Sequence, residues 1–132
     1  MKWLRYIPRW GPTAVVLGVI LTCTLLPGDD LPQVPAFPGA DKVVHALMFG
    51  VLAAVILYDI DVFSGRVRRG AYVAAALIST IVGGCIELLQ DAMGLGRTAE
   101  WLDFAADACG SFLLPLFVLP LINLILRNNG RH

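Results

Sequence analysis

The sequence predicts an all-α protein, an integral membrane bundle of four antiparallel transmembrane helices with both termini in the cytoplasm. Hydrophobic residues make up 58% of its 132 residues and charged residues only 15%, and the mean hydropathy is +0.75. A soluble protein of this composition would lack the polar surface needed to cover itself. The apolar residues form four stretches, and the lysines and arginines are sorted between alternate loops. Residues 1–132 are therefore expected to form a single membrane domain.

The four expected spans cover residues 10–26, 42–59, 71–90 and 104–126. Crossing the hydrocarbon core of a bilayer takes about 20 mostly apolar residues, with a range of about 17 to 25. The third and fourth stretches reach this length directly. The first reaches it if Trp10 to Pro12 lie in the interface, where Trp3 and Tyr6 would join Trp10 in an aromatic belt. The second reaches it if its polar first turn is helical.

Several residues predict how these helices are shaped and packed. Pro115 and Pro120 lie inside the fourth stretch and predict a bend or an early end there. Small residues recur every four positions in the third and fourth stretches, a pattern that lets membrane helices approach closely. They are Ala71, Ala75, Ser79 and Gly83, followed by Ala106 and Gly110. The segment from Pro27 to Ala40 is rich in proline and glycine, which predicts an irregular loop.

The placement of charged residues predicts the orientation. Eight of the ten basic residues lie before the first span, between the second and third, or after the fourth, namely Lys2, Arg5, Arg9, Arg66, Arg68, Arg69, Arg127 and Arg131. The other two, Lys42 and Arg97, accompany eight of the ten acidic residues. By the positive-inside rule, both termini and the middle loop are cytoplasmic. A cleaved signal peptide is the alternative for the N-terminus, but no small-x-small cleavage site follows, so we expect four retained spans.

Net charge and cysteine usage narrow the classes of function. The net charge is zero and the pI is about 6.7, so no basic excess indicates a nucleic-acid partner. Cys23, Cys85 and Cys109 lie at unrelated spacings without a C-x-x-C motif, which is typical of small packing residues rather than of a disulfide framework or a metal site. We predict no cofactor from the sequence.

Polar residues are concentrated at the outward ends of the second and third spans. Asp41 and His45 are four residues apart, so in a helix they stack on one side of its first outward turn. Glu87 and Gln90 are three residues apart and share a face at the outward end of the third span. Charged groups near hydrocarbon are costly and usually turn inward to pair. We therefore expect these residues to face the interior of the bundle.

The start of the fourth span supplies the third part of this polar cluster. Asp103, Asp107 and Gly110 follow an i, i+4, i+7 spacing, and Arg97 lies in the turn just before them. Three helices are therefore expected to present polar groups at one membrane depth. Arg97 and Lys42 can neutralise some of the carboxylates, but the cluster holds more polar groups than such ion pairs need.

The order of these residues resembles the VanZ-like family of small bacterial membrane proteins. The matching motifs are Asp-Lys-x-x-His, Glu-x-x-Gln, and Gly-Arg followed by Asp-x-x-x-Asp-x-x-Gly. They comprise Asp41, Lys42, His45, Glu87, Gln90, Gly96, Arg97, Asp103, Asp107 and Gly110. The resemblance implies a place in the bacterial cytoplasmic (inner) membrane and a link to the cell envelope, because the founding member is associated with resistance to the glycopeptide teicoplanin. It implies no established reaction, and many relatives carry Asn at the position of Asp107.

An enzyme acting on a lipid-linked or cell-wall head group at the outer face is the first functional hypothesis. His45 is suited to general acid or base catalysis near neutral pH, and the basic residues are suited to holding a phosphate or a carboxylate. The candidate catalytic residues are His45, Glu87 and Asp103. The candidate binding residues are Asp41, Lys42, Gln90, Arg97 and Asp107. The expected partners are membrane lipid and an anionic lipid-linked or cell-wall ligand.

Three alternatives stay open. A non-catalytic accessory protein could hold such a ligand without chemistry, and a purely structural ion-pair network could simply lock the helices. A zinc or manganese site is a variant of the enzyme hypothesis, although no tight ligand motif is present and we assign no metal ligand. The ligands of such a metal site would be Asp41, His45, Glu87 and Asp103. A transporter or channel is not expected of a monomer, because the cytoplasmic half of the bundle is apolar.

Overall fold

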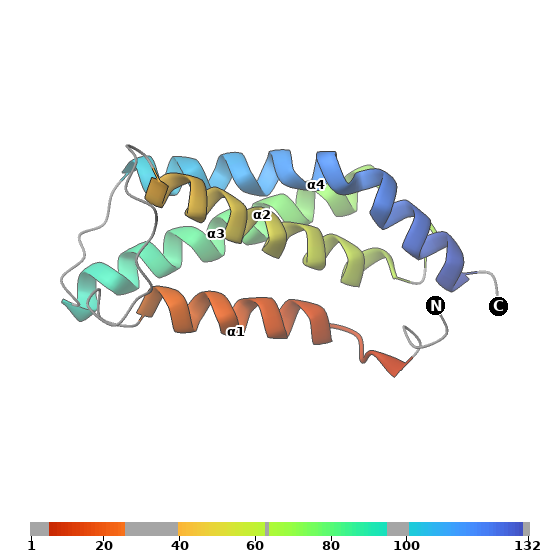
Figure 1. Ribbon diagram of the computed structural model, residues 1–132, viewed down its shortest axis with the longest axis horizontal. Coiled ribbons are helices and arrows are strands. Elements are labelled where there is room, and N and C mark those ends of the chain that lie inside the picture. The colour runs from red at the N-terminus through yellow and green to blue at the C-terminus, as the bar shows by residue number, and fades with distance from the viewer. Residues whose placement is uncertain (1–5, 26–39, 63, 95–100, 131–132) are drawn as a thin grey trace.

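The computed structural model describes residues 6–25, 40–62, 64–94 and 101–130. Within these ranges the chain forms four α-helices and no strand, which confirms the all-α class. The helices are α1 (Gly11–Leu25), α2 (Ala40–Asp61), α3 (Arg69–Met93) and α4 (Trp101–Gly130). Figure 1 shows them side by side along the long axis of the molecule. The proline-rich loop, the turn that holds Arg97, and Trp3 lie outside the described residues.

Three of the helices are long and apolar enough to cross a membrane. The qualifying segments are Lys42–Asp61, Arg69–Met93 and Trp101–Asn128. The outward faces of α3 and α4 expose large apolar side chains, including Leu88 at 70% and Phe117 at 80%. Such a surface suits contact with lipid, whereas in water it would favour association. Three of the four predicted spans are therefore confirmed as helices that are long and apolar enough to cross a membrane.

The remaining helix, α1, is shorter than the predicted first span. It has 15 residues, which at 1.5 Å per residue make a rod of about 22 Å, against a hydrocarbon core of about 30 Å. Its start is set by Trp10, whose φ of 68° lies in the left-handed region that a right-handed helix excludes. The interfacial residues before Gly11 therefore do not continue the helix.

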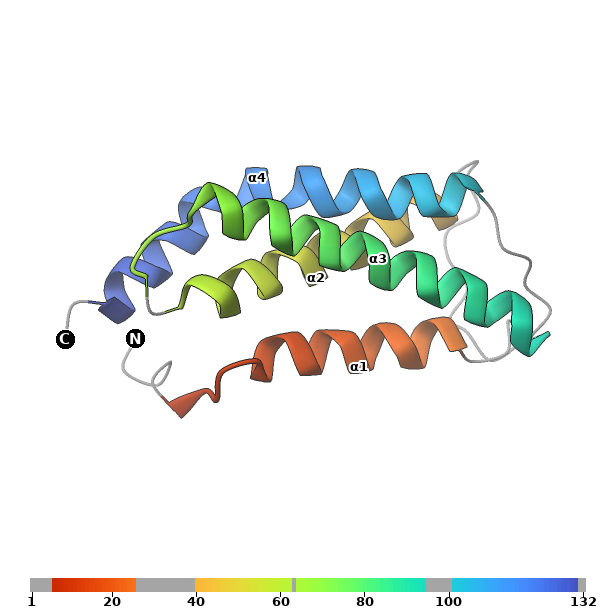
Figure 2. The ribbon, with the colours of Figure 1, turned by 180° about the vertical axis from the view of Figure 1, so that it is seen from behind.

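The bundle is arranged around α2 and α3. α2 lies in front of α3 in Figure 1 and behind it in Figure 2, so the two occupy opposite sides of the space between α1 and α4. α1 contacts both of them, and α4 contacts both of them. All four helices contribute to the apolar core, and α2 supplies the most residues. The core residues are Ile20, Phe49, Leu52, Ile56, Leu57, Ala71, Ala75, Ile86, Ile122 and Leu126.

Glycines allow α2 and α4 to touch through their backbones. A Cβ atom at Gly110 of α4 would overlap the backbone carbonyl of Ala46 in α2. One turn further along α2, a Cβ atom at Gly50 would lie 2.5 Å from the Cβ atom of Leu114. Because real Cβ contacts are much longer, this helix pair can reach its observed separation only with glycine at these positions.

The small residues of α3 form a buried stripe, as their spacing predicts. Ala71, Ala75, Ser79 and Gly83 are all buried. Gly83 faces α4, where its missing side chain leaves room for the carboxylate of Asp107. The stripe therefore turns the narrow side of α3 toward the polar cluster.

α4 continues through both of its prolines. The helix runs unbroken from Trp101 to Gly130 with Pro115 and Pro120 inside it. Figure 1 shows its blue C-terminal half turning away from the direction of its first half. Of the two outcomes that the prolines predicted, the bend is therefore seen and the early end is not. Proline removes a helical hydrogen bond and crowds the preceding turn, which bends a helix without necessarily ending it.

Two aspartates that the sequence analysis did not single out are buried at the end of α2. The Asp59 carboxylate accepts hydrogen bonds from Thr13 in the first turn of α1, at 3.1 Å from the backbone nitrogen and 2.6 Å from the hydroxyl. The Asp61 carboxylate accepts hydrogen bonds from Arg68, which precedes α3, at 2.8 Å from its backbone nitrogen and 2.6 Å from Nε. A carboxylate is favourable beside a helix N-terminus. These aspartates therefore fix the starts of α1 and α3 against α2.

We expect Asp61→Ala to lower the free energy of unfolding by about 1–3 kcal/mol, because it leaves the backbone N–H of Arg68 without its acceptor and removes a charge-assisted bond. Thermal unfolding of the purified protein in detergent measures the effect. Asp91→Ala, which truncates an exposed carboxylate of α3, is the matched control and should leave the melting temperature unchanged. Equal melting temperatures for the two variants would show that Asp61 does not stabilise the fold.

Candidate functional site

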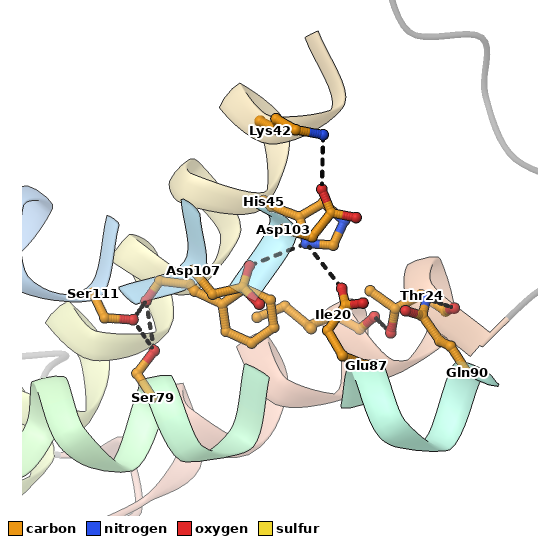
Figure 3. Close-up of polar contacts among 11 residues, drawn as sticks. Ile20, Thr24, Lys42, His45, Ser79, Glu87, Gln90, Asp103, Asp107 and Ser111 are labelled. Atoms are coloured by element: carbon orange, nitrogen blue, oxygen red, sulfur yellow. Dashed lines mark hydrogen bonds and ion pairs between the residues drawn. The ribbon is translucent and has the colours of Figure 1, made fainter. Parts of the chain in front are cut away.

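Three helices bring together His45 of α2, Glu87 of α3 and Asp107 of α4. Figure 3 shows the imidazole of His45 between the two carboxylates. Its Nδ1 atom lies 3.0 Å from Asp107 Oδ1 and 3.9 Å from Glu87 Oε1. All three residues are buried, and their side chains are 11%, 8% and 0% exposed for His45, Glu87 and Asp107. We call this group the His45 triad. It confirms the expectation that these three helices bring polar groups to one level.

The geometry orients the imidazole. At 3.0 Å the contact between His45 Nδ1 and Asp107 Oδ1 is a hydrogen bond, whereas 3.9 Å to Glu87 is too long for one. A carboxylate can only accept, so Nδ1 donates and the opposite nitrogen, Nε2, carries the lone pair in the neutral ring. The ring also stacks on Phe49 with a centroid separation of 6.3 Å. This arrangement makes His45 a proton acceptor of defined orientation.

Asp107 is fully buried and only half satisfied. Its Oδ1 atom accepts from His45, while Oδ2 has no hydrogen-bond partner among the described residues. The carboxylate lies over α3, where a Cβ atom at Gly83 would be 2.7 Å from Oδ2. Burying a carboxylate oxygen without a partner is costly, and such atoms are rare in folded proteins. The glycine of α3 and the aspartate of α4 together therefore place an acceptor inside the junction of the three helices.

Lys42 and Asp103 form the rim of the site, one turn closer to the helix ends. Lys42 Nζ lies 3.3 Å from Asp103 Oδ1, with side-chain exposures of 30% and 14%. The sequence analysis assigned Asp103 to the catalytic candidates and Asp107 to the binding residues. The structure places Asp107 against His45, and it places Asp103 against Lys42. The two aspartates are one turn apart on α4, so the depth at which α4 meets α2 decides which of them reaches the imidazole.

The other predicted residues lie away from the triad or outside the described residues. Gln90 donates from Nε2 to the backbone carbonyl of Thr24, which ties α3 to the end of α1. The backbone of Asp41 lies in the first turn of α2, but its side chain is outside the described part of the structure, and so is all of Arg97. The metal set expected from the sequence therefore changes, because Asp107 takes the place beside His45 and Glu87 that was expected of Asp103.

Two buried serines extend the polar contacts below the triad; Ser79 was predicted only as a small packing residue, and Ser111 was not predicted. Ser111 Oγ donates to Ser79 Oγ at 2.8 Å, and Ser79 Oγ donates to the backbone carbonyl of Phe49 at 2.7 Å. Ser111 follows Asp107 by four residues, and Ser79 precedes Gly83 by four residues. Continuing the i, i+4 spacing of the polar cluster would have found Ser111 one turn beyond Asp107 and Ser79 two turns before Glu87.

An apolar groove of about 470 Å³ lies between α3 and α4 beside the triad. It is lined by Ile81, Gly84, Cys85, Leu88, Trp101 and Phe104, and Glu87 is its one charged side chain. Glu87 therefore belongs both to the buried triad and to a surface groove. The groove is wide enough for a hydrocarbon chain and offers almost no polar surface, whereas the triad offers proton transfer or cation binding.

Chemically, the site combines one oriented imidazole, two carboxylates and a rim ammonium group. These groups can move a proton, hold a cation, or exchange an ion pair for an anionic ligand. No protein-family model, no curated protein and no solved structure matches this chain.

Proposed function

We propose that the chain is a VanZ-like protein of the bacterial cytoplasmic membrane that binds or modifies a lipid-linked or cell-wall precursor at the outer face of that membrane. One observation carries the proposal: Glu87 joins the buried His45 triad to an apolar groove between two membrane-spanning helices. A ligand with an apolar chain and a polar head matches this combination, because the groove suits the chain and the triad suits the head group.

The proposed topology is an antiparallel bundle of four spans with cytoplasmic termini, in which the triad lies toward the outer leaflet. Contacts at both ends of the helices support it. Thr13 at the start of α1 bonds Asp59 near the end of α2, while the end of α1 bonds Gln90 near the end of α3. Arginines gather near Asp59 and Asp61, at the opposite end of the bundle from the triad, as the positive-inside rule requires of a cytoplasmic end. α1 completes the bundle with its flanking residues in the interface.

In the proposed chemistry, His45 acts as the general base or acid. Asp107 holds the Nδ1 proton, so that Nε2 can take a proton from the ligand and return it. Lys42 at the rim offers an ammonium group to a phosphate or carboxylate, in exchange for its contact with Asp103. Arg97 is proposed as the second cation for that anionic group.

A non-catalytic accessory protein with a structural polar network is the second candidate. Two contacts between α2 and α4 favour it, the Lys42–Asp103 ion pair at 3.3 Å and the His45–Asp107 hydrogen bond at 3.0 Å. Both pairs join helices that are far apart in the sequence, so they hold the bundle together whatever else they do. Under this candidate, removing either contact reduces the amount of folded protein first.

We expect His45→Gln and Glu87→Gln to abolish the effect of the chain on teicoplanin susceptibility without lowering its abundance in the membrane. Both replacements keep a polar side chain of similar size but remove the proton-transfer group or the charge. The measurement uses a glycopeptide-susceptible bacterial host and records susceptibility together with membrane abundance. Asp91→Asn, which neutralises an exposed carboxylate one turn beyond Glu87, is the matched control and should behave as wild type.

The outcomes separate the two candidates. Loss of protection at constant abundance supports a functional site, and lipid extracts of the purified wild-type protein should then contain a precursor that is depleted from the His45→Gln protein. Abundance that falls together with protection supports the structural network. Full protection by well-folded forms of both variants would exclude a catalytic role for the triad. If the wild-type chain does not change the teicoplanin susceptibility of the host, the link to teicoplanin resistance is wrong for this protein.

A further inference from the structure

We infer that His45, Glu87 and Asp107 form a binding site for a divalent metal ion, with Zn²⁺ as the best match. Metal binding can be measured on the purified chain without any other ligand, so the inference stands or fails separately from the proposed function. It rests on the geometry of three ligand atoms, on the state of Asp107, and on the chemistry of the donor set.

The ligand atoms already lie at nearly the spacing that a tetrahedral ion requires. With bonds of about 2.0–2.2 Å, two ligand atoms of a tetrahedral zinc ion are about 3.3–3.6 Å apart. His45 Nδ1 lies 3.0 Å from Asp107 Oδ1 and 3.9 Å from Glu87 Oε1, and one ligand atom from each residue fits within 4.8 Å of the others. These two distances therefore lie about 0.3 Å outside the tetrahedral range, and small rotations about side-chain torsions can bring the three ligand atoms to an ion.

Asp107 provides an independent indication. The side chain is 0% exposed, and its Oδ2 atom lacks a hydrogen-bond partner within the described part of the chain. Both of its oxygens lie in the junction of α2, α3 and α4, one against His45 and the other above Gly83. A divalent cation satisfies the lone pairs of such an oxygen and offsets the cost of burying its charge.

The donor set selects the metal and leaves a coordination position open. One imidazole nitrogen and two carboxylate oxygens suit Zn²⁺ or Mn²⁺, and the absence of thiolate from the triad disfavours softer ions. In the metal-bound form the ion takes the place of the Nδ1 proton that Asp107 accepts in the metal-free site, and the neutral ring then carries its proton on Nε2. Three protein ligands are typical of catalytic zinc sites, in which a water molecule or a substrate oxygen takes the fourth position. Because Glu87 also lines the groove between α3 and α4, a ligand oxygen has a route to that position from the groove.

The test uses the full chain, purified in detergent without a polyhistidine tag, stripped with a chelator and dialysed against ZnCl₂. We expect one zinc ion per chain by elemental analysis, and a loss to background in His45→Ala and in Asp107→Asn. His132→Gln removes the other histidine of the chain and Asp91→Asn removes an exposed carboxylate, so both should retain the ion. Co²⁺ replacing Zn²⁺ should give the visible absorption bands of a tetrahedral site in the wild type and not in His45→Ala.

Folding is monitored, because a variant that misfolds would also lose the ion without revealing anything about the ligand residue. Each variant is compared by helical circular dichroism and gel filtration, and Glu87→Gln serves as a third ligand variant if one of the others fails to fold. A wild-type chain that binds no zinc or manganese above the level of folded His45→Ala would overturn the inference. Retention of the ion by folded His45→Ala and Asp107→Asn, with loss in His132→Gln, would overturn it equally and would locate binding at the C-terminus.

Discussion

Gly110→Ala is expected to separate α2 from α4 and to remove most of the folded protein from the membrane. A Cβ atom at this position would overlap the backbone carbonyl of Ala46, and a carbonyl inside a helix cannot turn aside as a flexible side chain can. Overpacking typically costs about 1–3 kcal/mol when side chains can adjust. We expect this variant to reach or exceed the upper end of that range. The melting temperature in detergent and the abundance in the membrane both measure the effect.

Gly18→Ala is the matched control for this replacement. A Cβ atom at Gly18, in the middle of α1, would meet no atom within 4 Å. Because alanine is favoured over glycine in a helix by roughly 1 kcal/mol, Gly18→Ala should melt at the wild-type temperature or slightly above it. Similar melting temperatures for Gly18→Ala and Gly110→Ala would show that the close contact between α2 and α4 does not limit stability.

Asp107→Asn is expected to leave the fold intact, or to stabilise it, while it abolishes zinc binding. The replacement has nearly the same shape, keeps a polar partner for His45, and removes a buried negative charge whose Oδ2 atom has no partner among the described residues. Replacing a poorly compensated buried charge by a neutral group of the same size is often neutral or stabilising, by about 1–4 kcal/mol.

The measurement for Asp107→Asn combines the melting temperature, zinc content and teicoplanin susceptibility. Asp103→Asn is an informative comparison, because it removes the rim partner of Lys42 one turn away and leaves the triad in place. We expect Asp103→Asn to keep its zinc ion and Asp107→Asn to lose it. A large drop in the melting temperature of Asp107→Asn, with a proportionate loss of function, would instead identify Asp107 as a structural residue.

Much of the fold follows from local properties of the sequence. Hydropathy alone locates α2, α3 and α4, because a helix in lipid must cover a fixed thickness with apolar side chains. The regular spacing of Ala71, Ala75, Ser79 and Gly83 predicts the buried face of α3, since residues that recur every four positions lie near one another on a helix. The length of α1 did not follow from hydropathy, because it depends on the backbone conformation of Trp10.

The candidate site could be predicted only in part. Hydropathy and residue spacing predict that His45, Glu87 and two aspartates lie near the same end of three helices, each on one face of its own helix. The sequence does not predict whether Asp103 or Asp107 reaches His45, because that depends on the position of α4 along the axis of α2. Similarly, Asp59 and Asp61 reveal their helix-capping role only when the starts of α1 and α3 lie beside them.

Contacts between residues that are distant in the chain settle both questions. The approach of Gly110 to Ala46 sets the level of α4 against α2 and so brings Asp107, not Asp103, to the imidazole. Gly83 then leaves the space that the Asp107 carboxylate occupies. The sequence specifies the chemistry that is available at each helix end. The close packing of backbones, which no local pattern measures, specifies which of those groups meet.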